Sequence, residues 1–227
     1  MTAALLLPSP AMAAPGQAII STDLVRTMVL LTLLSVAPAI FLSMTSFLRT
    51  IVVLTMVRHA FGMPETPPNP VLISLALFLT AFTMAPTLSV VNREALKPLL
   101  AGDVSVEQAV DRGSAPLRQF MLAQTRDSDI ESIYAIAKEP VPQTAEQVDL
   151  LKLTPAFILN ELRVSFTIGF VILLPFLLID LVVSSILLSL GMMMVPPATI
   201  SLPIKILMFV LIDGWGLVVQ GVLGSFR

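Results

Sequence analysis

Three long runs without a charged residue constrain this chain more than any other feature. They are Thr27–Leu48 (22 residues), Thr66–Asn92 (27 residues) and Leu181–Ile204 (24 residues). About 20 helical residues cross the roughly 30 Å hydrocarbon core of a bilayer, so the first two runs have the length of membrane helices. Segments 164–190 and 203–226 reach this length too if their few charged residues are tolerated. The sequence therefore predicts an all-α membrane protein with four apparent transmembrane helices in two apolar helical hairpins.

Charged residues are concentrated in the middle of the chain. Residues 92–163 hold 19 of the 28 charged side chains, and the charged fraction of 12% is about half of that in an ordinary soluble domain. With 56% hydrophobic residues, the composition excludes intrinsic disorder and argues against a conventional soluble fold. Four regions are predicted: a signal peptide or disordered N-terminus (1–20), a first apolar hairpin (21–91), a polar extracytoplasmic middle region (92–163) and a second apolar hairpin with a methionine loop (164–227).

The polar middle region is expected to be mostly helical. Its apolar residues recur at helical spacing in two stripes, Leu117, Phe120 and Met121 and then Ile130, Ile133 and Tyr134. Residues 126–129 (Arg-Asp-Ser-Asp) lie between the stripes and mark a helix break or cap. Two amphipathic helices are therefore predicted here.

The third apolar helix has clear start and stop signals. Thr154 followed by Pro155 predicts an N-cap and a first helical residue, and Gly191 predicts a left-handed C-terminal cap. The 36 residues from 155 to 190 would form a helix of about 54 Å, which is longer than a bilayer requires.

Prolines are expected to shape the other connections. Residues 62–70 are rich in proline and predict a break between the first two helices. Pro196 and Pro197 are expected to delay the fourth helix until about Pro203. Kinks are predicted inside the apolar helices at Pro38, Pro86 and Pro175.

The N-terminal residues leave two interpretations open. Ala11-Met-Ala13 has the A-x-A pattern of a signal-peptidase site, with cleavage after Ala13. The first basic residue is Arg26, so the usual positive region is missing, and a disordered alanine-rich tail is the alternative. Arg49 and Arg58 place the first loop in the cytoplasm by the positive-inside rule, which puts the termini and the middle region on the outer side.

Several kinds of chemistry are absent from the sequence. The chain has no cysteine, one histidine (His59) and no phosphate-binding G-x-x-x-x-G-K-[ST] motif. Its net charge of −2 does not indicate the basic surface that binds nucleic acid. The sequence therefore predicts a protein that is not an enzyme and uses no cofactor or metal.

Four charged residues lie inside apolar stretches, where charged side chains are costly and face protein or water: Arg49, Asp180, Lys205 and Asp213. Counted from a turn at 191–202, both acids lie about 15 Å into their helices and Lys205 about 3 Å. Lys205 would then lack an acid in its own hairpin, so a neighbouring subunit would supply one, or Lys205 would reach the membrane interface. A proton- or ion-coupled transporter that uses the two acids as a relay is a second functional hypothesis.

Three consecutive methionines, Met192, Met193 and Met194, lie in the loop after Gly191. Methionine is flexible and polarizable, so it packs against irregular or changing partners. A ring of such loops could close a pore by excluding water. The alternative is a loop that dips into the membrane interface.

These residues also resemble a known family. Residues 191–197 (Gly-Met-Met-Met-Val-Pro-Pro), together with 203–215, closely resemble the C-terminal signature of the FliP family of type III export-gate proteins. Residues 155–162 are similar to the other signature, in which a small hydroxyl residue is more usual than Asn160. The segment 195–197 (Val-Pro-Pro) favours the flagellar branch over the injectisome branch, which remains the alternative.

The resemblance implies a pore-forming subunit of the flagellar export gate in the bacterial inner membrane, at the flagellar basal body. Five copies would assemble with FliQ and FliR, near FlhB and FlhA and in contact with lipid, around a channel for unfolded flagellar subunits. The methionines 192–194 would seal the closed pore. Inter-subunit ionic contacts would involve Lys205, Asp180, Glu161 and Arg126.

Overall fold

The computed structural model describes residues 27–28, 31–32, 35, 38–39, 41–62 and 65–226, without the side chain of Glu146. The chain divides into two units, Met1–Pro38 and Ala39–Arg227, and the elements below belong to the second. The described residues form helices and no strand, which confirms the all-α prediction for them. The predicted signal peptide over residues 1–20 and its cleavage after Ala13 lie outside the described residues.

The first hairpin of the second unit consists of helix α2 (Phe47–Ala60) and helix α3 (Asn69–Val91). Helix α2 extends from the end of the uncharged run 27–48 to the predicted loop at 62–70, so Arg49 and Arg58 both lie within the helix. Both arginines are buried in α2 and bond to other parts of the chain, so neither charge interrupts the helix. The loop predicted at 62–70 does separate the two helices.

Helix α3 continues without a turn into the polar middle region. It passes through a π-helical segment, η1 (Asn92–Leu96), into the short helix α4 (Lys97–Ala101). Gly102 ends this segment with a φ of 82°, in the left-handed region.

Two helices form the rest of the middle region, as predicted. Helix α5 (Val106–Gln124) starts with a capping box, in which Ser105 Oγ accepts from the Gln108 amide at 3.3 Å and Gln108 Oε1 accepts from the Ser105 amide at 3.1 Å. Helix α6 (Asp127–Ala137) starts after Arg126, inside the predicted break. A 3₁₀ turn, η2 (Ala145–Gln147), leads to the next helix.

Helix α7 (Leu150–Ser189) has 40 residues, so the prediction of an overlong third helix is confirmed. The predicted start at Thr154-Pro155 was wrong. Asp149 caps the helix instead, because its Oδ1 accepts from the Leu151 amide at 3.1 Å. Pro155 therefore lies in the second turn, and Pro175 lies in the helix interior.

The fourth apolar segment is broken into two helices, α8 (Pro197–Leu211) and α9 (Gly214–Gly224), whose axes differ in direction by 66°. The expected start near Pro203 was wrong. Pro197 itself occupies the first turn of α8, where proline's missing N–H needs no partner, and Pro203 lies inside the helix.

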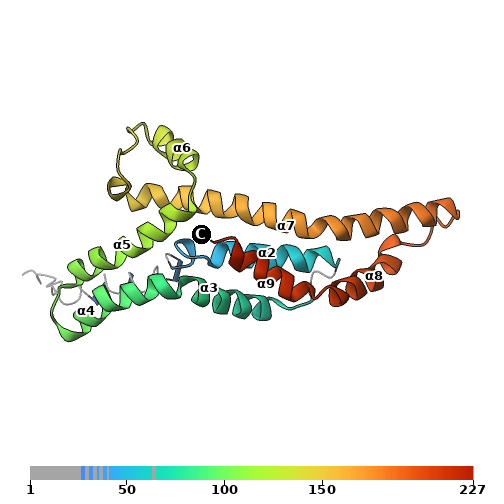
Figure 1. Ribbon diagram of the computed structural model, residues 1–227, viewed down its shortest axis with the longest axis horizontal. Coiled ribbons are helices and arrows are strands. Elements are labelled where there is room, and N and C mark those ends of the chain that lie inside the picture. Colours follow the sequence, from blue (N-terminus) through green and yellow to red (C-terminus); the bar gives the residue numbers. More distant parts are fainter. Residues whose placement is uncertain are drawn as a thin grey trace, which may run out of the picture. The chain divides into compact units, whose positions relative to one another are not determined.

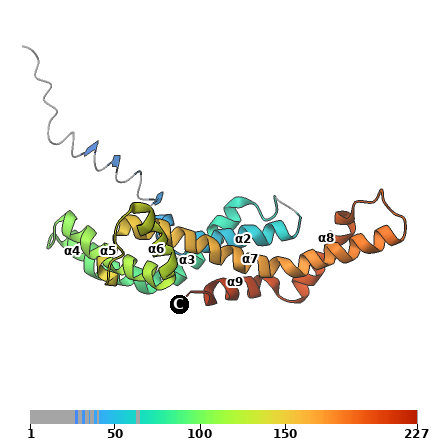
Figure 2. The same cartoon turned by 90° about the horizontal axis from the view of Figure 1, so that it is seen from above.

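Helix α2 lies between α7 and α3 and contacts both (Figure 1). One core joins α2, α3, α7, α8 and α9 around residues such as Val57, Phe176 and Val222. A second core joins α5, α6 and the start of α7 around Met121, Tyr134 and Phe157. In the view from above, α6 lies against the α5 end of α7, whereas α8 lies against its other end (Figure 2).

Two helical stretches of the described residues are long and apolar enough to cross a membrane. They are Asn69–Ala101, with a mean hydropathy of 2.0, and Leu150–Ser189, with 2.7. The bent pair α8 and α9 makes a third if it counts as one span. The first of the four predicted spans, 27–48, lies partly outside the described residues, so the number four stays a prediction.

Candidate functional site: the methionine loop and the charges behind it

The methionine loop forms the tip of the α7–α8 hairpin. Gly191 has a φ of 71°, and the Met192 amide donates to the Leu187 carbonyl at 2.9 Å while the Gly191 amide donates to the Leu188 carbonyl at 3.1 Å. These two bonds form a Schellman motif, which confirms the predicted C-terminal cap. The helix therefore ends abruptly, and the loop stands clear of both helices.

All three methionine side chains are exposed in the single chain. Their exposed fractions are 42% for Met192, 80% for Met193 and 96% for Met194. Pro196 and Pro197 follow directly and fix where α8 begins. The loop is therefore short and held at both ends, with apolar side chains that contact little of their own chain.

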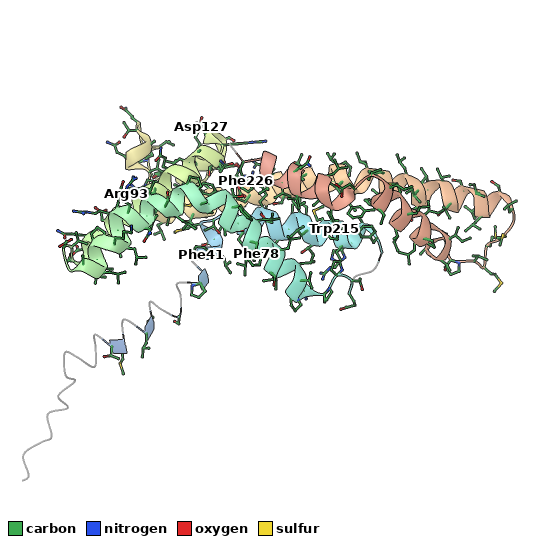
Figure 3. All side chains as sticks on the ribbon, turned by 60° about the horizontal axis from the view of Figure 1, so that its bottom comes forward. Phe41, Phe78, Arg93, Asp127, Trp215 and Phe226 are labelled. Atoms are coloured by element: carbon green, nitrogen blue, oxygen red, sulfur yellow. The ribbon has the colours of Figure 1, made fainter. Side chains whose placement is uncertain are left out.

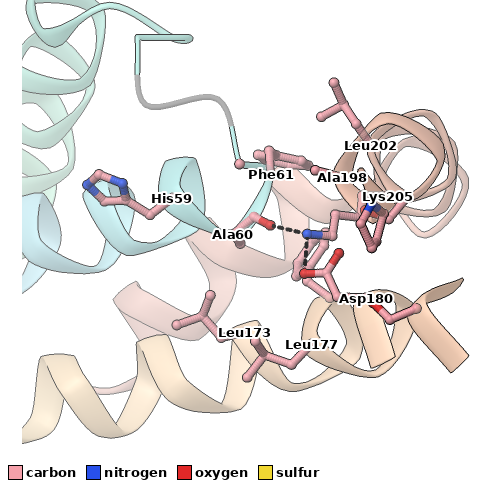
Figure 4. A pocket seen from close by; sticks show the side chains of 14 residues that line it. His59, Ala60, Phe61, Leu173, Leu177, Asp180, Ala198, Leu202 and Lys205 are labelled. Carbon is pink, nitrogen blue, oxygen red and sulfur yellow. Dashed lines mark hydrogen bonds and ion pairs between the residues drawn. The ribbon is translucent and has the colours of Figure 1, made fainter. Parts of the chain in front are cut away.

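Lys205 forms an ion pair with Asp180 within the same hairpin. Its Nζ lies 2.7 Å from Asp180 Oδ2 and donates to the Ala60 carbonyl at 3.3 Å (Figure 4). The ammonium is buried, with 7% of the Lys205 side chain exposed, whereas 41% of the Asp180 side chain is exposed. Lys205 thus connects α8 to α7 and to the carboxyl end of α2, where a cation is favoured.

This pair corrects the depth comparison made from the sequence, which left Lys205 without an acid in its own hairpin. The comparison failed because α8 starts at Pro197 and not near Pro203. Lys205 is therefore eight residues into α8, and Asp180 is nine residues before the end of α7 at Ser189, so the two are level.

A cavity of about 420 Å³ opens beside the Lys205–Asp180 pair (Figure 4). Side chains of α7 and α8 line it together with the end of α2, including His59, Phe61 and Leu177. His59 is exposed, and Figure 4 shows it away from the ion pair. Among the described residues, no group of three or more His, Cys, Asp or Glu side chains could hold a metal ion.

A second buried ion pair joins Arg49 of α2 to Glu161 of α7. Arg49 Nε donates to Glu161 Oε2 at 2.8 Å, and Nη2 pairs with Oε1. Only 2% of the Arg49 side chain and none of the Glu161 side chain are exposed. Glu161 therefore has its partner in its own chain, although the family resemblance placed it in a contact between subunits.

Arg49 also connects two other parts of the chain. Its Nη1 donates to the Ser225 carbonyl at 2.8 Å, and its Nη2 donates to Gln124 Oε1 at 3.4 Å. The guanidinium lies over the Phe226 ring, 3.9 Å from the centroid. Sequence reasoning noted Arg49 as a costly charge but missed these partners, since they come from segments up to 176 residues away.

The remaining predicted residues lie apart from these pairs. Arg126 is exposed and forms no ion pair within the described part of the chain. Asp213 lies at the break between α8 and α9, away from the helix interior position expected for a relay. Asp180 is neutralised by Lys205, so the two acids are not equivalent and a relay has less support.

Comparison with known proteins identifies the family. The FliP family matches residues 30–222 of the chain. The flagellar biosynthetic protein FliP of Pectobacterium carotovorum subsp. carotovorum is 48% identical over 202 residues, covering 89% of this chain and 78% of that protein. The protein of the same name from Bacillus subtilis (strain 168) is 48% identical over 202 residues, covering 89% and 91%. The one from Rhizobium meliloti (strain 1021) is 44% identical over 221 residues, covering 96% and 90%. The chain therefore belongs to the FliP family, as its loop and helix signatures indicated.

Proposed function

We propose that this chain is a pore-forming subunit of the flagellar type III export gate, which passes unfolded flagellar subunits across the bacterial inner membrane. Its relatives are flagellar biosynthetic proteins by name, which favours the flagellar gate over an injectisome gate. The two or three span-capable helices support a location in or at the membrane. Its role is structural, without catalysis or a cofactor.

The exposed methionine loop is the observation on which this proposal rests. Three flexible apolar side chains project from a tightly held hairpin tip and contact little of their own chain. In a ring of copies, such side chains would meet at a constriction and exclude water, which closes it to small solutes. Because methionine adapts its shape, the same side chains would fit around an unfolded chain in transit.

The surface of the second apolar hairpin supports an assembly. Apolar side chains stand out along α7 and α8 (Figure 3), and they are too numerous for a monomer in water. The exposed residues of α7 include Phe166, Phe170, Val171, Leu174, Leu177, Leu178, Leu181, Val182 and Ile186. We propose that four neighbouring copies, FliQ, FliR and lipid cover these faces, with FlhB and FlhA nearby.

The charged residues have different roles in this proposal. The Lys205–Asp180 and Arg49–Glu161 pairs hold each chain in shape. Arg126 is exposed and remains available for an acid of a neighbouring subunit. The half-exposed Asp180 carboxylate has a second oxygen that can accept from a neighbour as well.

The proposed regions follow the sequence: a first apolar hairpin (21–91), a polar middle region (92–163) on the outer side and a second apolar hairpin (164–227). The middle region contains most of the charged side chains and folds as its own helical cluster around Met121 and Tyr134. This placement puts the start of α7 outside the membrane and its methionine end toward the channel.

A leak assay tests the sealing role. Gate complexes of this chain with FliQ and FliR would be reconstituted into vesicles that contain a small fluorescent dye. Replacing Met192, Met193 and Met194 together with alanine should raise dye release several-fold, because the side chains that close the pore are shortened.

Two matched controls make the assay specific. Replacing the same three methionines with leucine keeps their apolar volume and should leave release near the wild-type rate. Ile136→Ala removes an exposed apolar side chain from α6, away from the faces of α7 and α8, and should also have little effect. Equal release from wild type and the triple alanine variant, in complexes of the same composition, would rule out the seal.

A further inference from the structure

The corner between α8 and α9 divides the fourth apolar segment into two helices. Only Ile212 and Asp213 separate the two helices, yet the helix axes differ by 66°. The Ile212 amide still donates to the Met208 carbonyl at 3.1 Å, and the Leu217 amide already donates to the Asp213 carbonyl at 3.1 Å. The hydrogen bonding of one helix therefore passes directly to the next. The change of direction is made by Ile212, with φ −91° and ψ 8°, and by the left-handed residue that follows it.

That residue is Asp213, whose backbone is left-handed, with φ 52° and ψ 53°. Side chains with a Cβ adopt this conformation at a cost, although aspartate tolerates it better than most. Its carboxylate lies over the first turn of α9, since a Cβ on Gly216 would come 2.3 Å from Asp213 Oδ2. A negative charge is favoured at the amino end of a helix, so this position stabilises the bent arrangement.

The corner is packed on one side and open on the other. A Cβ on Gly214 would come 2.1 Å from the Phe209 ring, so the chain folds closely over this buried side chain. Trp215 contacts the same ring edge-on, with 5.4 Å between centroids. Beside them is an apolar cavity of about 280 Å³, lined by residues of both helices, including Ile206 and Val210. Space to rearrange therefore exists at the corner itself.

The two helices are anchored to different parts of the chain. The end of α9 is held by Arg49, through the Ser225 carbonyl and the Phe226 ring. Helix α8 is held by Lys205, through Asp180 and the Ala60 carbonyl. The two anchors differ in exposure, because 41% of the Asp180 side chain is exposed whereas Arg49 and its carboxylate partner are buried.

We propose that Ile212–Asp213 is a hinge with two states. In the bent state Asp213 is left-handed and its carboxylate lies at the amino end of α9, beside Gly216. In the straight state Asp213 is right-handed, and α8 and α9 join into one helix from Pro197 to Gly224, about 42 Å long. The ion pair that holds α8 is the more exposed of the two anchors, so we place the movement in α8 and the attached methionine loop. The link to gate opening rests on the proposed function, whereas the hinge itself does not.

A distance measurement tests the hinge in the assembled gate. The chain has no native cysteine, so Ile200→Cys on α8 and Gln220→Cys on α9 accept spin labels at unique exposed positions. Labelled chains would be diluted with unlabelled chains, in complexes whose other subunits have no reactive cysteine. A straight helix separates these two Cα atoms by about 30 Å, and the bend shortens this distance.

Substitutions at Asp213 should change the relative populations of the short (bent) and long (straight) distances. Asp213→Gly removes the cost of the left-handed conformation and should favour the short distance. Asp213→Ala removes the charge at the amino end of α9 and keeps the cost of the left-handed backbone. Its ratio of bent to straight should therefore be about fivefold lower than that of the glycine variant, which corresponds to about 1 kcal/mol. Asp213→Asn tolerates the left-handed region but loses the negative charge, so its ratio should lie between those of wild type and the alanine variant.

A pair of glycine variants completes the test. Gly216→Ala should displace the Asp213 carboxylate and favour the long distance, whereas Gly221→Ala, whose added Cβ meets nothing within 4 Å, should change nothing. One identical distance distribution in the glycine and alanine variants of Asp213 would overturn the hinge, whatever the leak assay shows. Shifted distances without any change in dye release would support the hinge and count against its link to gate opening, whereas the seal is tested separately by the methionine variants.

Discussion

Arg49 and Glu161 show how a charge can lie deep among apolar helices without breaking them. Three nitrogens of Arg49 reach acceptors on α5, α7 and the segment after α9, and its flat face covers Phe226. The geometry requires the planar five-donor group of arginine, which a lysine ammonium does not reproduce. This residue therefore ties the polar middle region to both apolar hairpins.

Removing one partner of the Arg49–Glu161 pair should strongly destabilise the protein. Arg49→Met leaves the Glu161 carboxylate buried without a counter-charge, which costs about 3–5 kcal/mol. Thermal unfolding of the detergent-purified complex should show a clear fall in Tm. The double variant Arg49→Met with Glu161→Leu should recover a large part of the loss, since no buried charge is left alone. A double variant no more stable than the single one would contradict this account of the pair.

Charge reversals can show whether Lys205 and Asp180 pair within one chain or between two subunits. The test compares both reversals in the same chain with one reversal in each of two chains. Lys205→Asp alone should prevent normal assembly, because two acids would face each other at the α7–α8 contact. Adding Asp180→Lys to the same chain should restore part of the assembly, measured by co-purification with FliQ and FliR. Two co-expressed chains that carry one change each should not be rescued. Rescue only in the mixed expression would show that the contact lies between subunits.

At the scale of elements, the α7–α8 hairpin depends on its two ends. A Schellman motif at Gly191 stops α7, and Pro197 in the first turn starts α8, so the seven residues 190–196 connect the helices. Helices α7 and α8 are then in register, so that Lys205 pairs with Asp180. A shift in either boundary would separate that pair and move the methionines.

The left-handed cap at Gly191 should contribute measurably to the stability of the α7–α8 hairpin. Gly191→Ala should destabilise the hairpin by about 1–2 kcal/mol, because a Cβ disfavours its φ of 71°. For a chain of this size the Tm should fall by roughly 2–4 °C per kcal/mol. Gly221→Ala is the control, since it lies inside α9 with a right-handed backbone and open space around it. Equal Tm values for the two variants would contradict the role of the cap.

Local sequence signals predicted some elements well. The stop of α7 at Gly191, the break near Arg126 and the stripes of α5 and α6 follow from one or two turns of sequence, and all are confirmed. Boundaries set by competing local signals were wrong. Thr154-Pro155 is a good start signal, but Asp149 provides a cap one turn earlier. Pro197 fits the first turn of a helix as well as Pro203 does.

Contacts between distant segments could not be predicted from one sequence. The partners of Arg49 come from three separate elements, and nothing in the spacing of Glu161, Gln124 or Ser225 indicates that they meet. The Lys205–Asp180 pair depended on the start of α8, so an error of six residues there separated the two charges in the predicted hairpin. The exposed methionine loop needed no distant contact, and its place between two helices was predicted correctly.

At the scale of the whole molecule, the main feature is a large exposed apolar surface that lipid or other subunits have to cover. Long faces of α3, α7 and α8 expose large apolar side chains, including Phe78, Phe82, Phe170 and Leu178. Figure 3 shows Phe78 of α3 and Trp215 of α9 among the side chains at the surface. Lipid can cover only the outward part of such faces if the chain surrounds a channel, so the rest must pack on other subunits.

The mass of the detergent-purified complex tests this central claim most directly. The chain would be co-expressed with FliQ and FliR, and the intact assembly would be measured by native mass spectrometry. An assembly that contains five copies of this 24.4 kDa chain together with both partners is the predicted result. A monomer of this chain that is stable in detergent, with neither partner bound, would contradict the account.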